Sequence, residues 1–280
     1  MKSVIFFNPY KEGIFEKLEK LVKILRDLKI QPFIPLDECL NVKNIPVCND
    51  LKMADIYFTL GGDGTLLSII QKDINFDIPI IPINMGFLGF LAYYDIENVK
   101  EILVKFLNHE FSFERRYILK VDLKRKNKIF KTFLALNDVV VSKNAMSKII
   151  SLSIFTGNCY INSYRSDGII VATPTGSTAH SLSAGGPIVY PEEKVFIITP
   201  ICPHTLSNRP LILPWNHKIK IKYLSDKPMC SAALTVDGQI GIELEKDDEI
   251  CIYNSNMFLK IIAVDVDYFN ILRKKLNWGI

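Results

Sequence analysis

The first hundred residues alternate between short apolar runs and longer segments whose apolar residues recur at helical spacing. The apolar runs predict four strands, at 4–7, 32–35, 56–60 and 78–83. Apolar residues three or four positions apart predict three helices, at 14–28, 66–70 and 96–107. This alternation of strands and helices is typical of a parallel sheet with helices on its faces.

The pattern changes near residue 111, where short strands separated by turn residues take over. These strands are predicted at 117–123, 129–134, 139–142, 149–155, 169–172, 219–223, 232–236, 250–253 and 259–264. We therefore expect an α/β plus β fold, with a Rossmann-like parallel α/β domain over 1–110 and a mainly β domain over 111–266. A cleft is expected between the two domains, and a helical tail, 267–280, is expected to pack back on the first.

Composition and charge narrow the classes of function. The chain has 280 residues, of which 49% are hydrophobic and 23% charged, so a disordered chain is excluded. A formal net charge of +4 does not predict a nucleic-acid partner, although it suits an anionic small molecule. The six cysteines, among them Cys39, form no C-x-x-C pair, which argues against a zinc ribbon or a disulfide framework and favours a cytoplasmic location.

No membrane segment is expected. The longest uncharged stretch, 168–191, is rich in Gly, Pro, Ser and Thr and contains His180, a composition unsuited to a bilayer. The apolar run at 4–7 is too short for the core of a secretory signal.

The first chemical motif is Gly61-Gly62-Asp63-Gly64-Thr65, which lies between a predicted strand and a predicted helix. Glycines permit a sharp turn and close approach of a ligand, and a helix N-terminus favours phosphate. A carboxylate inside such a loop is electrostatically unfavourable beside phosphate, which suggests that Asp63 is a catalytic or metal-organising group. The alternative is an ordinary Asp-Gly turn in which Asp63 caps the helix.

The second motif is the uncharged segment 173–187, which is dense in hydroxyls and small residues and favours a flat polar ligand such as a nucleotide. A plain Ser/Thr-rich loop is the alternative. Two shorter motifs, Asn137-Asp138 and Arg165-Ser166-Asp167-Gly168, are by themselves no more than turn signals.

Taken together, these motifs resemble those of the NAD kinases, over nearly the whole chain. The glycine loop matches that family's first signature, and 84–91 matches its Asn-x-Gly-x-Leu-Gly-Phe-Leu segment. Segment 173–187 is close to its most specific segment, Thr-Pro-Thr-Gly-Ser-Thr-Ala-Tyr-x-x-Ser-x-Gly-Gly. Later landmarks are matched by Arg209-Pro210 and by Asp237-Gly238-Gln239.

The resemblance implies transfer of the γ-phosphoryl group of ATP to the 2′-hydroxyl of the adenosine ribose of NAD, which yields NADP. Asp63 would be the general base. An ordinary Asp pKa of about 3.9 suffices because a loose transition state releases the proton late. Magnesium would arrive with ATP and keep water and phosphate as ligands, so no protein metal ligand is named. A homodimer or homotetramer is implied, because the family's sites form across a subunit interface.

The resemblance also assigns the binding residues. The phosphate-binding residues would be Gly61, Gly62, Gly64 and Thr65. The NAD-binding residues would be Asp63, Gly64, Asn137, Asp138, Arg165, Asp167, Thr178, Ala179, His180 and Ser183. Asp138 replaces the family's usual Glu and is one methylene shorter, and His180 replaces the usual Tyr. Family members with Arg at the place of Arg165 resemble enzymes that use NAD and not NADH.

Two other classes of function stay open at this point. The glycine loop is shared with diacylglycerol, sphingosine and 6-phosphofructo-kinases, so a lipid kinase is the catalytic alternative. Such an enzyme needs a membrane-facing patch, and no basic amphipathic helix is predicted. A nucleotide-sensing module is the non-enzymatic alternative, and it would not need Asp63. The sequence does not distinguish ATP from polyphosphate as donor.

Overall fold

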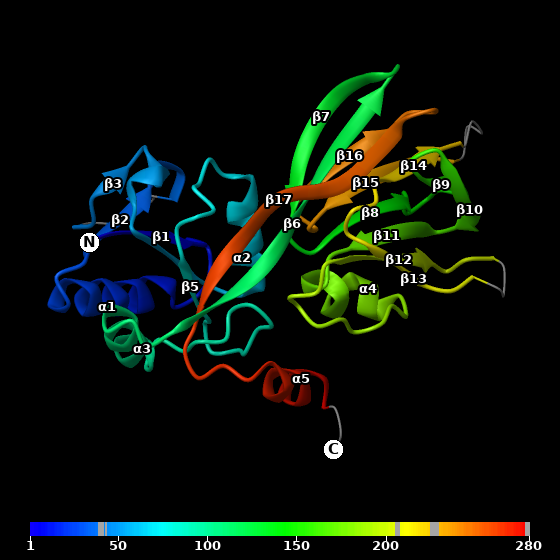
Figure 1. The fold of residues 1–280 in the computed structure, drawn as a ribbon. Coiled ribbons are helices and arrows are strands. Elements are labelled where there is room, and N and C mark those ends of the chain that lie inside the picture. The colour runs from blue at the N-terminus through cyan, green and yellow to red at the C-terminus, as the bar shows by residue number, and fades with distance from the viewer. Residues whose placement is uncertain (39–41, 43, 205–207, 225–229, 278–280) are drawn as a thin grey trace. The chain divides into compact units, whose positions relative to one another are not determined.

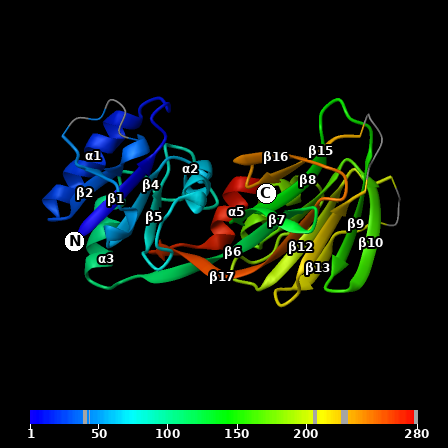
Figure 2. The ribbon, with the colours of Figure 1, turned by 90° about the horizontal axis from the view of Figure 1, so that it is seen from above.

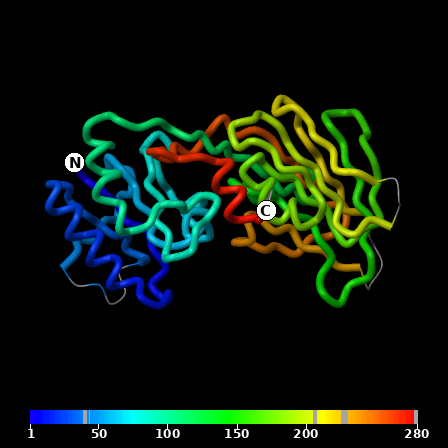
Figure 3. Tube along the Cα trace, turned by 90° about the horizontal axis from the view of Figure 1, so that it is seen from below, coloured from blue at the N-terminus to red at the C-terminus, as the bar shows by residue number. Residues whose placement is uncertain are grey.

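The computed structural model describes residues 1–38, 42, 44–204, 208–224 and 230–277, and Cys39 lies outside them. The chain forms two compact units: unit 1 is Met1–Arg115 with Leu259–Ile280, and unit 2 is Arg116–Phe258 (Figure 1). Two long strands, β6 (Ser112–Arg125) and β17 (Glu249–Ala263), run from one unit into the other, as the chain trace shows (Figure 3). The divisions therefore lie within strands, a few residues from the expected 110/111 and 266/267.

Unit 1 contains a parallel sheet in the order β5-β4-β1-β2-β3, and Ile261 of β17 pairs in parallel with Ile80 at its β5 edge. Its strands are β1 (Lys2–Phe7), β2 (Gln31–Pro35), β3 (Val47–Cys48), β4 (Ile56–Leu60) and β5 (Ile80–Ile83). Its α-helices are α1 (Ile14–Asp27), α2 (Asp63–Ser68), α3 (Val99–Leu107) and α5 (Tyr268–Leu276). Its 3₁₀ turns are η1 (Leu36–Glu38), η2 (Leu51–Met53) and η3 (Ile69–Gln71).

Helix α1 shows why this layer forms. Its residues Ile14, Leu18 and Leu25 recur at helical spacing and are buried, while the Lys and Glu residues between them lie on the outer side. The apolar side packs in one cluster with Ile5 and Phe58 of the central strands. Figure 2 shows α1 running beside β1 and β2. Central parallel strands covered in this way are apolar throughout, as the five buried residues of β4 are.

Unit 2 is built from antiparallel sheets. One has the order β13-β12-β11-β8-β15-β16, and the other contains β10-β9-β14-β17 together with the β6–β7 hairpin. The bounds of the strands are β7 (Lys128–Ala135), β8 (Asp138–Lys143), β9 (Ile150–Thr156), β10 (Cys159–Ser166), β11 (Gly168–Ala172), β12 (Val195–Ile201), β13 (Leu211–Pro214), β14 (Ile219–Tyr223), β15 (Ala232–Val236) and β16 (Ile240–Leu244). Both sheets contribute to one apolar cluster, for example through Val141, Ile169 and Ile221.

Three features differ from the sequence-based expectation. The strands expected at 250–253 and 259–264 are one strand, β17. The polar residues between the two apolar runs include Asn256, which adopts a left-handed φ of 61° within this strand. The helix after the glycines begins earlier, at Asp63. Arg165 and Ser166, expected in a turn, end strand β10, which was not predicted because its mixed polar pattern lacks an apolar run.

No helix among the described residues is long and apolar enough to cross a membrane. The segment 168–191 instead supplies the buried strand β11, the 3₁₀ turn η4 (Thr175–Thr178) and the short helix α4 (His180–Ser183).

Candidate active site

The glycine loop of unit 1 follows β4 directly. Glycine is present at its positions for two different reasons. A Cβ on Gly61 would lie 2.0 Å from Oγ1 of Thr65, so the packing of Thr65 requires glycine there. A Cβ on Gly62 or Gly64 would meet no atom within 4 Å, and Gly62 has an ordinary φ of −101°. Since neither packing nor backbone strain explains these two glycines, their effect is to keep the space beside the start of α2 open.

Asp63 joins this loop to the segment 84–92. Its Oδ2 accepts the N–H of Phe90 at 2.9 Å, and its Oδ1 accepts those of Leu91 at 3.0 Å and Ala92 at 2.8 Å. A Cβ on Gly89 would lie 2.1 Å from Oδ1 of Asp63, so this glycine permits the close approach. A carboxylate offers about four acceptor positions, and these bonds leave one of them, on Oδ2. The motif pattern placed both segments in one family but did not show that Asp63 connects them.

In unit 2, Asp237 organises the segment that begins β8. Its Oδ2 accepts the N–H of Leu136 at 2.7 Å, and its Oδ1 accepts those of Asn137 at 2.7 Å and Asp138 at 3.0 Å. The N–H of Asp237 in turn donates to the carbonyl of Asp138 at 2.9 Å. Asp237 has a left-handed φ of 50° and is followed by Gly238 at 64°, which turns the chain from β15 to β16.

Thr173, at the start of the segment 173–187, forms hydrogen bonds with the carbonyl groups of the segment 136–138. Thr173 donates from Oγ1 to the carbonyl of Leu136 at 2.6 Å and from its N–H to the carbonyl of Asn137 at 2.8 Å. A Cβ on Gly176 would lie 2.0 Å from that carbonyl oxygen of Asn137, so the turn needs glycine. All six backbone N–H and C=O groups of residues 136–138 are thereby bonded. The side chains of Asn137 and Asp138 project from a rigidly held backbone.

A cavity of about 270 Å³ in unit 2 brings together part of the predicted site. It is lined by Asn137, Asp138, Val140, Ser142, Ala179, His180, Thr235, Asp237 and Gly238. Five of the residues proposed from the sequence thus meet there. Arg165, Asp167, Thr178, Ser183, Arg209 and Gln239, also in unit 2, do not line it. The lining contains no Lys or Arg, so it suits a neutral, hydrogen-bonding part of a ligand better than a phosphate.

Two carboxyl groups dominate the electrostatics of this cavity. Burial raises the pKa of Asp138 to about 6. Burial also raises the pKa of Asp237 to about 7, with a smaller upward contribution from the charge of Asp138 and an opposing effect of the three N–H bonds. The Asp138 carboxylate has no hydrogen-bond partner among the described residues, although the residue is only 5% exposed. A buried carboxylate without a partner is unfavourable for folding, which is typical of a ligand-binding group.

The remaining predicted residues lie elsewhere in unit 2. Asp167 forms an ion pair with Lys143, with 2.9 Å between Nζ and Oδ1. Arg165 and Ser183 are exposed, as are the landmark residues Arg209 and Gln239. Thr178 is half-buried in η4.

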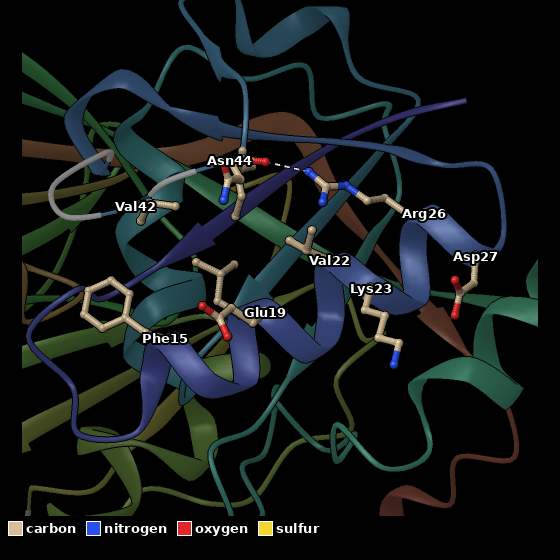
Figure 4. A pocket seen from close by; sticks show the side chains of 10 residues that line it. Phe15, Glu19, Val22, Lys23, Arg26, Asp27, Val42 and Asn44 are labelled. Carbon is tan, nitrogen blue, oxygen red and sulfur yellow. Dashed lines mark hydrogen bonds between the residues drawn. The ribbon is translucent and has the colours of Figure 1, made fainter.

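A different hollow, of about 380 Å³, lies in unit 1 beside α1 and includes Phe15, Val22 and Asn44 (Figure 4). None of its lining residues belongs to a predicted motif, and Arg26 donates a hydrogen bond to the carbonyl of Asn44 at its edge. The size of a hollow therefore does not locate the chemistry in this chain, whereas the signature segments do.

The parallel α/β unit with its glycine loop and the β unit with its polar cavity define a two-unit kinase. The model of the ATP-NAD kinase N-terminal domain matches residues 45–111, and that of the ATP-NAD kinase C-terminal domain matches residues 136–264. Curated NAD kinases are similar: that of Aquifex aeolicus is 35% identical over 280 residues, all of both chains, and that of Clostridium botulinum (Kyoto) is 44% identical over 225 residues, 80% of this chain and 79% of the other. The chain belongs to the NAD kinase family and is a phosphotransferase.

Solved structures agree with this assignment. Yeast NADH kinase in complex with NADH has a TM-score of 0.88 at 28% identity, over 100% of this chain and 88% of the other. An NAD kinase from Archaeoglobus fulgidus in complex with ATP has a TM-score of 0.77 at 26% identity, over 99% of both. These relatives confirm the α/β plus β fold and the kinase activity, and they lend no support to a lipid kinase.

Proposed function

We propose that this chain transfers the γ-phosphoryl group of ATP to the 2′-hydroxyl of the adenosine ribose of NAD. The observation that carries this proposal is the cavity of unit 2, where the buried carboxylate of Asp138, which has no hydrogen-bond partner in the part of the chain that the structure describes, lies beside Asn137. A carboxylate in a cavity without Lys or Arg accepts hydrogen bonds from hydroxyl groups such as those of a ribose. Ala179 and His180, from the segment 173–187, line the same cavity and would contact the nucleoside.

The glycine loop of unit 1 would hold phosphate groups. Gly62 and Gly64 leave space at the start of α2, where free backbone N–H groups favour anions. Gly61 would contribute by allowing the turn, and Thr65 by packing over it.

Magnesium would be bound mainly by the phosphates of ATP. The described residues contain no group of three or more His, Cys, Asp or Glu side chains that could hold a metal ion. Asp63 is the acidic residue of the glycine loop, and its carboxylate already accepts hydrogen bonds from three N–H groups. A metal ion carried by ATP would neutralise charge that develops on the transferred phosphoryl group. The protein residues would position the nucleotide around it.

Asp63 would act as the general base. The one acceptor position left on its Oδ2 can take a hydrogen bond from the acceptor hydroxyl, while the three N–H bonds keep the carboxylate in a fixed orientation. In phosphoryl transfer through a loose transition state, this orientation matters more than basicity.

The proposed activity is tested directly by mixing the protein with ATP, Mg²⁺ and NAD and detecting NADP with an NADP-specific dehydrogenase. Formation of NADP that requires both ATP and NAD is expected. Replacing ATP by polyphosphate in the same assay determines the donor. If no NADP forms while NAD and ATP both bind, the proposal is wrong.

The structure predicts that NAD affinity depends on pH. Asp138 faces Asp237 from the β15–β16 turn and His180 from α4, with no Lys or Arg in the cavity lining. As the pH falls through about 6, Asp138 takes up a proton and accepts hydrogen bonds less strongly, so NAD affinity is expected to fall. Calorimetric titrations between pH 5 and 8 measure this change. An equal pH dependence in Asp138→Asn would contradict the assignment to Asp138.

The same two pKa values have the opposite effect on folding. Both carboxyl groups bind protons more tightly in the folded chain than in the unfolded chain. The stability that they contribute is therefore fully present below their ordinary pKa near 4, and it is lost as the pH rises through about 6 and about 7. Acidification in this range is expected to stabilise unit 2 through these groups while it weakens NAD binding.

We further propose that the enzyme prefers NAD to NADH and that Arg165 contributes to this choice. Yeast NADH kinase shows that acceptor choice differs within this fold. Because Asp167 is paired with Lys143, Arg165 would act through its own bulk and charge. Arg165→Gly is expected to raise kcat/KM for NADH relative to NAD at least about tenfold, or ~1.4 kcal/mol. Equal losses with both acceptors would show that Arg165 supports the fold instead.

A cytoplasmic homodimer or homotetramer is proposed as well. The five described cysteines, Cys48, Cys159, Cys202, Cys230 and Cys251, are all free thiols, which fits a reducing compartment. Arg165 and Asp167 lie outside the lining of the unit 2 cavity. This position is expected if they contact a ligand that is held by a second copy of the chain. Analytical ultracentrifugation with and without NAD tests the oligomer.

A further inference from the structure

Asp237 has no part in the mechanism proposed above, yet it makes four hydrogen bonds to the segment that carries the acceptor-binding side chains. Three are accepted by its carboxylate, from Leu136, Asn137 and Asp138, and the fourth is donated by its N–H. The residue is 7% exposed. As in Asp63, both carboxylate oxygens bind three consecutive backbone amides, an arrangement that requires the positions of acceptor and donors to be closely matched.

The position of Asp237 explains this match. The antiparallel pairing of β8 and β15 ends at Val139 and Val236, so residues 136–138 extend beyond the last backbone partner that β15 offers. Buried N–H groups left without an acceptor are strongly unfavourable. Asp237 follows Val236 immediately, and its left-handed φ of 50° turns the side chain back along β8. Its carboxylate therefore takes the place of missing strand carbonyls.

The carboxylate is retained at a cost to folding. Burial raises the pKa of Asp237 to about 7 even though three N–H bonds favour its charged form. A second buried carboxyl group, that of Asp138, adds repulsion. A neutral amide side chain would avoid both penalties, but its single oxygen cannot serve all three N–H groups, so the carboxylate is needed to hold the whole segment.

We propose that Asp237 is a positioning residue for acceptor binding: by holding the amides of 136–138, it sets the direction in which Asn137 and Asp138 enter the cavity. This inference rests on the proposed function of that cavity as the site of the adenosine end of NAD. Asp237 acts through the backbone of Asn137 and Asp138. Its effect is on binding of the acceptor nucleotide and not on the glycine loop, which belongs to unit 1.

The test is steady-state kinetics of Asp237→Asn with NAD and ATP varied separately. Asparagine tolerates the left-handed backbone but presents one oxygen and one N–H₂ group to three donors, so at least one bond is lost. KM for NAD is expected to rise roughly 10- to 100-fold, with KM for ATP within about twofold and kcat largely retained. If Asp237→Asn does not fold, Asp237→Gly replaces it. Glycine also tolerates the left-handed backbone, and it removes both carboxylate oxygens.

Asp248→Asn is the matched control. Asp248 is also a buried carboxylate of unit 2, accepts the N–H of Glu245 at 2.9 Å and pairs with Arg125, but it does not line the cavity. This variant is expected to lower the melting temperature and leave KM for NAD unchanged. An unchanged KM for NAD in the Asp237 variants, with only a lower melting temperature, would overturn the positioning role.

Different measurements test the positioning role of Asp237 and the proposed function of the chain. Absence of NADP formation by the unmodified protein would refute the function itself. A normal KM for NAD in the Asp237 variants of an active enzyme would refute only the positioning role. Amide chemical shifts of Leu136, Asn137 and Asp138 in ¹⁵N spectra provide the structural readout. They should move in Asp237→Asn and not in Asp248→Asn.

Discussion

Asp63→Asn is expected to lower kcat by roughly 10²- to 10⁴-fold, the usual effect of removing a general base. NAD binding should persist, because Asn137 and Asp138, which line the cavity proposed to hold the adenosine end, are unchanged. The change has a second consequence. Asparagine has one acceptor oxygen for the three amides of Phe90, Leu91 and Ala92, so the segment 84–92 also loses part of its support.

Gly89→Ala separates these two effects. Its Cβ would lie 2.1 Å from Oδ1 of Asp63, so it disturbs the same contact while the carboxylate is kept. If Asp63 is the base, Asp63→Asn should reduce kcat much more than Gly89→Ala does. Near-normal kcat in Asp63→Asn would rule out the base assignment, and equal losses in both variants would indicate a purely architectural role.

Asp138→Ala is expected to weaken NAD binding by roughly 1–3 kcal/mol, because hydrogen bonds to a charged group are lost. The same substitution should raise the free energy of unfolding at pH 8. It removes a carboxylate that is buried, has no partner among the described residues and has a pKa raised to about 6. Loss of affinity combined with gain of stability is typical of a residue retained for function. Calorimetry and chemical denaturation measure the two quantities.

Asp122→Ala is a suitable comparison. Asp122 is similarly buried in unit 2, but its carboxylate accepts hydrogen bonds from Thr132 and Tyr253, each at 2.7 Å. Its loss should lower stability and leave NAD affinity unchanged. Unchanged NAD affinity in Asp138→Ala would mean that the shorter side chain, compared with the family's Glu, does not reach the ribose.

The sequence predicted most elements of unit 1, although it missed the short strand β3. Strand β4 was predicted with its observed limits, and the apolar spacing of α1 matches its buried face, because both signals are local. The prediction was poorer in unit 2, where β10, β12, β13 and β16 were not anticipated. Antiparallel strands with one exposed face have mixed patterns, and their limits depend on partners distant in the chain.

The motifs were likewise recognisable in the sequence, but the hydrogen bonds that join them were not. The spacing of residues indicated a phosphate loop and a nucleotide-binding segment, and these led to the family. From the sequence, Asp237 was a landmark without a role, and Asp63 was a general base and NAD-binding residue with no structural partner assigned. Their bonds to backbone amides join residues 99–101 positions apart in one case and 27–29 in the other. Backbone amides have no identity in the sequence, so such partners become visible only in the folded chain.

The sequence by itself thus determined the family and the α/β plus β fold class, because these depend on local pattern and on recognisable spacing. Only the tertiary structure decided which residues share the cavity of unit 2, that the Asp138 carboxylate has no partner among the residues described, and that Arg165 and Asp167 lie outside the cavity lining. Burial and hydrogen-bond partners arise from contacts between distant segments, and they set the pKa values and directions of side chains that residue identity leaves open.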